Sequence, residues 1–266
     1  MRVLVTGGTG VLGRELVPRL RDNGAEVRVL SRRPVDRPGF AQGDLETGEG
    51  LAAALDGVDT VAHCASSADY LRPRRDVEAA RRLLAAARDS GPHLVYISIV
   101  GVDEIAFGYF RAKRATERLI EDSGLPWTTL RTTQFHDLSL RFLMLMAKPP
   151  VILVPRGFKG QPVDTGEVAD RMAELVLGEP AGRVPDMGGP RVEDSEQMLR
   201  RFLALTGRRR PVLHVPAPGR VAAGFRAGHH LLSGDGVRGT RTFEEYLRTR
   251  IGPDGTVEPP YLRQWA

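Results

Sequence analysis

The chain has 266 residues, 41% of them hydrophobic, and its 38 basic and 33 acidic side chains give a formal net charge of +5. A chain of this length can bury a sizeable core. The small, dispersed charge argues against a nucleic-acid partner, and the basic run from Gly207 to Pro211 is better explained as a solvated turn. The single cysteine, Cys64, excludes an intrachain disulfide.

The first residues lead directly into an apolar strand, without the charged and then apolar segment of a secretory leader. No uninterrupted apolar run has the length that spans a bilayer. We therefore expect a cytoplasmic protein without a membrane segment.

A glycine-rich turn follows the first strand. Val-Leu-Val at residues 3–5 runs into Gly7, Gly10 and Gly13, spaced as G-x-x-G-x-x-G. Such a turn brings backbone N–H groups and a helix N-terminus close to a pyrophosphate. We expect a Cβ at Gly7 or Gly10 to obstruct the pyrophosphate, and Gly13 to let the helix pack tightly on the strand; the alternative is a surface turn. The residues predicted to bind the dinucleotide here are Gly7, Thr9, Gly10, Val11, Leu12 and Gly13.

The second predicted strand, residues 26–33, ends about 20 residues beyond the glycines, where an NAD enzyme carries an acid for the ribose. No acid stands there. Ser31, Arg32 and Arg33 offer a hydroxyl and two guanidinium groups, which suit a 2′-phosphate. This favours NADP(H), the alternative being a pair of solvated arginines.

Two further segments are predicted to contact the cofactor. Asp44 is suited to accept from the adenine amino group while Leu45 packs on the ring, although a loop-capping aspartate explains the residue type equally well. Ala65 and Ser66, at the end of the third predicted strand, are small enough for a cofactor to lie across them.

The histidines and the cysteine do not form a metal site in this interpretation. His63 and Cys64 are adjacent on a strand and face opposite sides, and His229 and His230 are adjacent on a predicted helix. We therefore predict no metal.

Hydrophobic periodicity predicts alternating strands and helices up to residue 131. The strands are 3–5, 26–33, 60–66, 93–98 and 127–131, and the helices are 12–23, 51–55, 76–89 and 109–124. This alternation predicts an α/β fold with a Rossmann-type, doubly wound parallel sheet. We assign residues 1–135 to a cofactor-binding core and 136–266 to a small substrate-side region of the same unit.

Three residues are candidates for the chemistry. Tyr109 and Lys113 lie at i and i+4, on one helix face, and Ser98 ends a neighbouring strand. An ammonium close to a phenol lowers the phenol pKa, so Lys113 is expected to poise Tyr109 and to hold the nicotinamide ribose, while Ser98 binds the substrate oxygen. The alternative is an aromatic staple at a helix start with Lys113 on a solvated face.

These motifs resemble the atypical, NmrA-like branch of the short-chain dehydrogenase/reductase superfamily. The similarity covers about residues 1–135 well and the rest loosely. It rests on TGGTGVLG at 6–13, SRR at 31–33, VYISIVGVD at 95–103, YFRAK at 109–113 and GLPWTTLR at 124–131. The resemblance implies NADP(H) bound across the sheet, with a Ser-Tyr-Lys set able to serve reduction or oxidation. The branch also includes proteins that bind the dinucleotide and catalyse nothing.

Later elements are expected on the substrate side. Residues 135–146 form an apolar helix whose methionines either line a pocket or belong to a plain core helix. A strand at 151–154 and helices from 164, at 197–205, 222–232 and 243–250 complete the prediction, with a further strand at 212–215. The sequence leaves open whether the tail from Gly252 to Ala266 packs over the pocket.

The leading hypothesis is an NADP(H)-dependent oxidoreductase that transfers hydride to or from a small, rather apolar carbonyl, quinone or imine. The alternatives are a non-catalytic NADP(H)-binding sensor or structural subunit and, less favoured because residues 135–146 are apolar, a sugar-nucleotide epimerase or dehydratase. We expect a monomer or homodimer with a small-molecule substrate.

Overall fold

A computed structural model describes residues 1–35, 37–66 and 72–258. The chain forms two compact, interleaved units. The first unit comprises Met1–Ser98, Phe107–Arg131 and Gly166–Pro185, and the second comprises Ile99–Ala106, Thr132–Thr165 and Asp186–Ala266. The chain therefore passes between the units at five points, after residues 98, 106, 131, 165 and 185. The predicted division at residue 135 concerns which part binds which ligand, and it stays a prediction.

The first unit is built on a sheet in the order β6-β5-β4-β1-β2-β3, with β9 beside β6. Its strands are β1 (Arg2–Thr6), β2 (Glu26–Ser31), β3 (Phe40–Gln42), β4 (Thr60–His63), β5 (His93–Ile99), β6 (Trp127–Thr132) and β9 (Gly182–Arg183), the last residues of β5 and β6 counting with the second unit. The pairs β1–β2, β1–β4, β2–β3, β4–β5 and β6–β9 are parallel. The predicted Rossmann-type α/β fold is confirmed.

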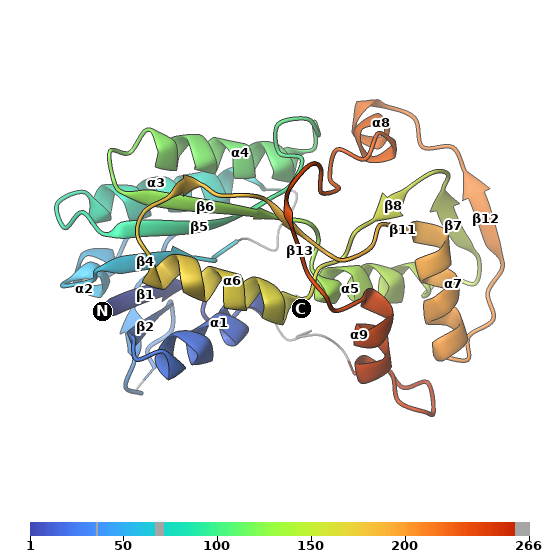
Figure 1. The fold of residues 1–266 in the computed structure, drawn as a ribbon, viewed down its shortest axis with the longest axis horizontal. Coiled ribbons are helices and arrows are strands. Elements are labelled where there is room, and N and C mark those ends of the chain that lie inside the picture. Colours follow the sequence, from blue (N-terminus) through green and yellow to red (C-terminus); the bar gives the residue numbers. More distant parts are fainter. Residues whose placement is uncertain (36, 67–71, 259–266) are drawn as a thin grey trace. The chain divides into compact units, whose positions relative to one another are not determined.

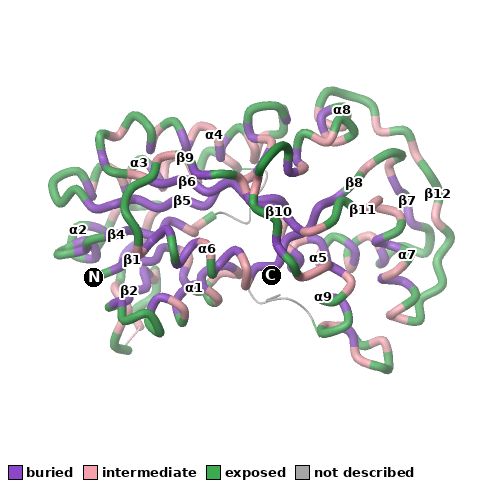
Figure 2. The backbone as a smooth tube through the Cα atoms, viewed as in Figure 1, coloured by how far each residue is buried: buried purple, intermediate pink, exposed green. Residues whose placement is uncertain are grey.

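Helices cover both faces of this sheet. They are α1 (Val11–Asp22), α2 (Leu51–Leu55), α3 (Arg74–Ala87), α4 (Gly108–Glu121) and α6 (Thr165–Leu177). The pair α1 and α6 lies on one face and the pair α3 and α4 on the other (Figure 1). Because both faces are covered, the central strands are buried along most of their length, as the purple trace of Figure 2 shows.

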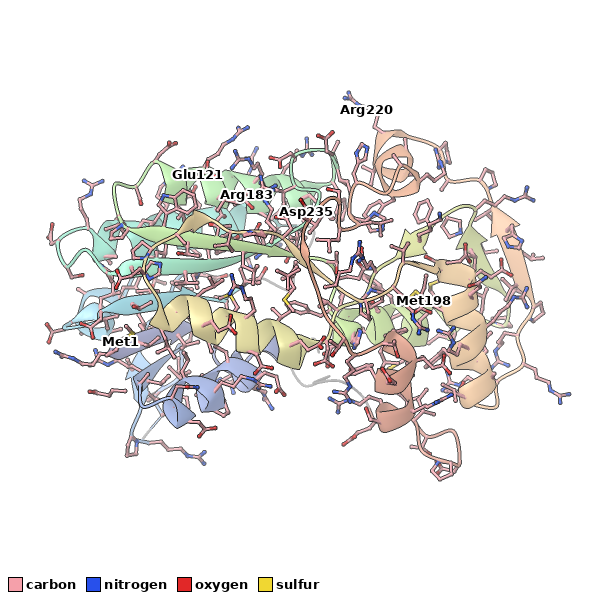
Figure 3. All side chains as sticks on the ribbon, viewed as in Figure 1. Met1, Glu121, Arg183, Met198, Arg220 and Asp235 are labelled. Atoms are coloured by element: carbon pink, nitrogen blue, oxygen red, sulfur yellow. The ribbon has the colours of Figure 1, made fainter. Side chains whose placement is uncertain are left out.

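The second unit has its own apolar core. Its helices are α5 (His136–Met146), α7 (Ser195–Leu205), α8 (Arg220–Arg226) and α9 (Phe243–Arg250), and its strands are β7 (Ile152–Pro155), β8 (Lys159–Gly160), β10 (Met187–Gly188), β11 (Glu193–Asp194), β12 (Val212–Val215) and β13 (Val237–Arg238). Leu140 of α5, Phe202 of α7 and Phe243 of α9 meet in this core, together with Met198, which is labelled in Figure 3. Met144 and Met146 pack against it, as expected of a core helix.

Three of the differences from the prediction have a local cause. β4 ends at His63 instead of Ser66, because the following chain turns toward the glycine loop. β3 was not predicted, since three residues are too few for a period-2 pattern. α8 ends at Arg226, well before residue 232, because Gly228 adopts a φ of +78° that does not continue a right-handed helix.

None of the helices in the described part of the chain combines the length and the hydropathy that crossing a membrane requires. Residues 259–266 of the tail lie outside the described residues.

Candidate cofactor and active site

The glycine turn joins β1 to α1. Gly7 has a φ of +70°, and its carbonyl accepts from Gly10 N at 2.9 Å. Gly10 is the N-cap residue of α1 and has no side chain with which to cap it. The first backbone N–H groups of α1 have no acceptor within the helix and carry its positive dipole end. The turn therefore has the chemistry of an anion cradle.

The atoms that an added Cβ would meet differ among the three glycines of the turn. A Cβ at Gly13 would lie 2.2 Å from Gly7 O, so the predicted tight packing of helix on strand is confirmed. A Cβ at Gly7 would lie 2.7 Å from Ala65 N. The close approach at Gly7 is therefore to the chain after β4, and obstruction of the pyrophosphate by a Cβ at Gly7 stays a prediction. A Cβ at Gly10 would meet Gly7 O at 3.1 Å, a tight but smaller conflict.

The arginine pair follows the carboxyl end of β2. Ser31 Oγ donates to Arg33 O at 2.8 Å, so its hydroxyl is engaged by its own loop. Arg32 and Arg33 are exposed, and neither guanidinium has a hydrogen-bond or ion-pair partner within residues 1–35, 37–66 and 72–258. Two free guanidinium groups at this strand end fit a phosphate ligand.

Asp44 and Leu45 have local structural partners. Asp44 Oδ1 accepts from Glu46 N at 2.7 Å and Asp44 O from Gly48 N at 2.8 Å, which is the loop-capping alternative. Leu45 packs partly against the core of the first unit. Contact with adenine stays a prediction for both residues.

Tyr109 stands at the start of α4 and reaches the loop after β4. Ser66 Oγ lies 3.2 Å from Tyr109 OH and donates to Asp76 Oδ2 of α3 at 2.8 Å. Burial raises the pKa of Tyr109 to about 12, a rise opposed by the Ser66 hydrogen bond and increased by the Asp76 carboxylate. The phenol pKa is therefore raised, whereas the sequence predicted that Lys113 would lower it. Sequence reasoning missed Asp76, which no motif marks.

Lys113 is buried, with 5% of its surface exposed, so it is not on the solvated face of the alternative interpretation. Its Nζ donates to Ile97 O at 3.1 Å and lies 4.9 Å from the Tyr96 ring centroid and 5.9 Å from that of Tyr109. Burial and, to a smaller extent, the Lys113 charge lower the pKa of His63 to about 3. Lys113 is thus the central charge of the region between β4, β5 and α4.

His63 and Tyr96 form the wall beside this ammonium. Their rings stack with centroids 5.4 Å apart, and His63 Nδ1 lies 2.7 Å from Thr6 Oγ1. Thr6 Oγ1 also accepts from Ala65 N at 3.3 Å, and the His63 tautomer decides which of Thr6 and His63 donates. Burial raises the pKa of Tyr96 to about 12 and that of Cys64 to about 12. His63, Cys64 and Tyr96 are therefore neutral at physiological pH. No sequence motif indicated that they surround Lys113.

Ser98 lies at the carboxyl end of β5 and is 1% exposed. Its Oγ has no hydrogen-bond partner in the part of the chain that the structure describes. A buried hydroxyl without a partner is costly, so such an atom marks a place where a ligand oxygen or nitrogen would be stabilised.

Glu117 and Arg131 hold α4 against β6. Glu117 Oε1 accepts from Arg131 Nε at 2.8 Å and Oε2 from Arg131 NH2 at 2.6 Å, with both side chains buried. Arg114 donates to Glu117 and to Glu121, which is labelled in Figure 3 at the end of α4. This bidentate pair fixes the helix that carries Tyr109 and Lys113.

Residues 7–177 match a protein family that is described as NAD(P)H-binding. The chain belongs to this NAD(P)H-binding family. The match covers most of the first unit, including the glycine turn and the helix that carries Tyr109 and Lys113. It confirms the resemblance to NmrA-like, short-chain dehydrogenase/reductase-type proteins.

The chain is similar to relatives that are named for different activities. It is 38% identical over 146 residues to the (4-alkanoyl-5-oxo-2,5-dihydrofuran-3-yl)methyl phosphate reductase of Streptomyces griseus, covering 52% of this chain and 49% of the reductase. The matched part thus spans about half of that relative's length. It is also 26% identical over 236 residues to the photosystem II assembly factor Ycf39 of Cyanophora paradoxa, covering 81% and 72% of the two chains.

Among solved structures, the NADPH-dependent quinone oxidoreductase QOR2 of Escherichia coli, complexed with NADPH, has a TM-score of 0.69 to this chain. The two share 19% identity over 85% of this chain and 87% of QOR2. At this identity the likeness concerns the fold.

Proposed function

We propose that the protein is an NADP(H)-dependent oxidoreductase that transfers hydride to or from a small, rather apolar carbonyl, quinone or imine. The observation that carries the proposal is the position of the buried Lys113 side chain. It lies one helical turn from Tyr109, and its Nζ donates to Ile97 O of β5, the strand that also carries Ser98.

The residues present fit the dinucleotide. The N-terminus of α1 would hold the pyrophosphate, and Arg32 and Arg33 would pair with the 2′-phosphate. An ammonium has three N–H donors and Ile97 O takes one, so Lys113 can also donate to ribose hydroxyls. Bound NADP(H) supplies hydride chemistry.

The chain's own groups would handle the oxygen and the proton. Ser98 Oγ would donate to the substrate oxygen as negative charge develops on it. Tyr109 Oη would give its proton to that oxygen during reduction, and would regain one from solvent. Lys113 would offset the negative charge left on Tyr109, because its ammonium lies on the same helix face.

The test is NADPH consumption against a panel of carbonyls, quinones and imines, with cofactor binding measured in parallel. On a substrate found in this way, Tyr109→Phe should lower turnover by about 10²- to 10⁴-fold with little change in NADPH affinity, because only one hydroxyl is lost. A Tyr246→Phe variant, which removes a buried hydroxyl of the second unit, is the matched control. Wild-type turnover in Tyr109→Phe would remove Tyr109 from the mechanism.

A second candidate is a protein that binds NADP(H) without turnover. It is favoured by the raised Tyr109 pKa and by the engagement of that hydroxyl with Ser66. The similarity to the assembly factor Ycf39 supports this second candidate. Tight NADPH binding with no consumption on the whole panel would favour this candidate.

A further inference from the structure

Three side chains from different elements form a hydrogen-bonded row. They are Tyr109 of α4, Ser66 after β4 and Asp76 of α3, joined at 3.2 and 2.8 Å. A carboxylate only accepts, so the single proton of the Ser66 hydroxyl points to Asp76. Ser66 Oγ is then an acceptor toward Tyr109, and the phenol donates to it.

This direction of donation opposes ionisation of the phenol. A tyrosinate at this position would need the Ser66 proton, which the Asp76 carboxylate already holds, and the negative charge of Asp76 would repel it. The same carboxylate adds to the rise in the pKa of Tyr109 that burial causes.

Other charged or titratable groups also face Tyr109. Lys113 on α4 has its Nζ 5.9 Å from the Tyr109 ring centroid, and that ammonium is bonded to Ile97 O. Tyr96 of β5 interacts electrostatically with Tyr109 and is neutral at physiological pH, since burial raises its pKa to about 12. Among these groups Asp76 is the anion, and it acts on the phenol through Ser66.

We propose that Asp76, acting through Ser66, is a positioning residue that orients the Tyr109 hydroxyl and keeps it protonated, as the proton donor in reduction of an acceptor must be. The inference rests on the proposed oxidoreductase function. In reduction, the acceptor carbon gains a hydride from the reduced cofactor and the acceptor oxygen gains the Tyr109 proton, which solvent later replaces. In oxidation, Tyr109 Oη must first lose its proton, and the Ser66–Asp76 pair disfavours that state.

The test is a pH titration of the tyrosine ring signals by NMR with carbon-13-labelled tyrosine, in which Tyr109→Phe identifies the Tyr109 signal. Asp76→Asn should lower the Tyr109 midpoint by about 1 pH unit, because the charge is removed and the Ser66 proton is released. Asp89→Asn, which removes an exposed carboxylate just after α3, is the matched control and should leave the midpoint unchanged. Ser66→Ala breaks the link between the phenol and the carboxylate, so Asp76→Asn should move the midpoint less in the Ser66→Ala background than in the wild type.

An unchanged midpoint in Asp76→Asn would overturn the proposal, and so would an equal shift by Asp76→Asn in the wild-type and Ser66→Ala backgrounds. With a verified substrate, the pH above which the rate of reduction falls should be about one unit lower in Asp76→Asn than in the wild type, because Tyr109 then loses its proton at a lower pH; an unchanged pH profile would also contradict it. The titration requires neither cofactor nor substrate. Failure to find any substrate would therefore count against the proposed function alone.

Discussion

Lys113 carries a charge at a position that water hardly reaches. The residue has 5% of its surface exposed. Its ammonium donates to the backbone of β5 and has no carboxylate partner among the described residues. Burying a charge without a counter-charge costs stability, so a protein that keeps such a group gains something else from it. In our proposal the gain is cofactor binding.

Replacing Lys113 by methionine should separate these two effects. The substitution keeps the aliphatic stem and removes the charge, so the free energy of unfolding should stay equal or rise by about 1 kcal/mol. NADPH should bind about 10- to 100-fold more weakly, because a charged donor to the ribose is lost. Thermal unfolding and NADPH titration measure the two quantities. Lys148→Met, at an exposed position after α5, should alter neither; unchanged NADPH affinity in Lys113→Met would contradict the assignment.

Arg32 and Arg33 determine the choice between cofactors in our proposal. NADPH should bind at least tenfold more tightly than NADH, a difference of about 1.4 kcal/mol, and the double substitution Arg32→Ala, Arg33→Ala should remove the difference. Titration of both cofactors by fluorescence measures it. The pair Arg209→Ala, Arg210→Ala removes two exposed arginines of the second unit and is the control for net charge. Equal affinities in the wild type would disprove the NADP assignment.

The spacing of residues along the chain predicts part of this site. Tyr109 and Lys113 share a helix face because they are four apart, and Ser98 ends a strand because a buried run stops there. The rise in the pKa of Tyr109 was not predictable in this way. It depends on burial and on Asp76, 33 positions earlier in the chain, and no local pattern connects the two.

The β1–α1 connection shows how one element junction can serve both packing and binding. Gly13→Ala would place a Cβ 2.2 Å from Gly7 O, which α1 can avoid only by moving away from the strand. It should lower the free energy of unfolding by about 2 to 3 kcal/mol. Gly10→Ala meets its nearest atom at 3.1 Å and should remain close to wild-type stability while weakening NADPH binding. Urea unfolding and NADPH titration of both variants test this; similar stability losses would show that Gly10 is also a packing residue.

The long elements of the first unit follow from periodicity, whereas the two-residue strands do not. β8 to β11 contain two residues each, and such strands form because a neighbouring chain supplies hydrogen-bond partners. Gly188 in β10, for example, is fixed by its pairing with Arg238, far along the chain. A sequence pattern of two residues carries no period, so these strands lie beyond prediction from local sequence.

At the scale of the whole molecule, buried histidines link stability to pH. Burial lowers the pKa of His63 from 6.5 to about 3, so between these values the unfolded chain takes up a proton that the folded protein excludes. Stability therefore falls as the pH drops below about 6.5, by up to about 1.4 kcal/mol per pH unit for this group. His93 and His230, whose pKa values burial also lowers, act in the same direction.

Urea unfolding at several values between about pH 7 and pH 4 measures this dependence. His63→Asn should flatten the curve by close to one proton. His229→Asn, at an exposed position, should keep the wild-type slope. Equal slopes in wild type and His63→Asn would show that His63 titrates normally in the folded protein.

The interleaving of the two units could not be read from composition. The sequence contains no long or biased linker, and the chain changes unit within strands β5 and β6 and at the start of α6. Parallel strands require long return connections, and here those connections are used to build a second core.

This connectivity affects the order in which the chain can fold during its synthesis. The first unit receives its last segment, Gly166–Pro185, only after the 34 residues Thr132–Thr165 of the second unit have been made, with the earlier Ile99–Ala106 already in place.

 At about 5 to 20 residues per second, a ribosome needs on the order of 10 to 40 s to reach residue 185. Until then α6 is missing beside α1, and Asp170 cannot pair with Arg19.

A nascent chain in this interval leaves uncovered the part of the sheet face that α6 later covers beside α1. The buried strands β1, β4 and β5 are complete by residue 99, long before their covering helix α6 is made. Exposed apolar strands are the segments that chaperones hold and that aggregate when they are left uncovered. The interleaved arrangement also means that no single cut in the gene yields either unit whole.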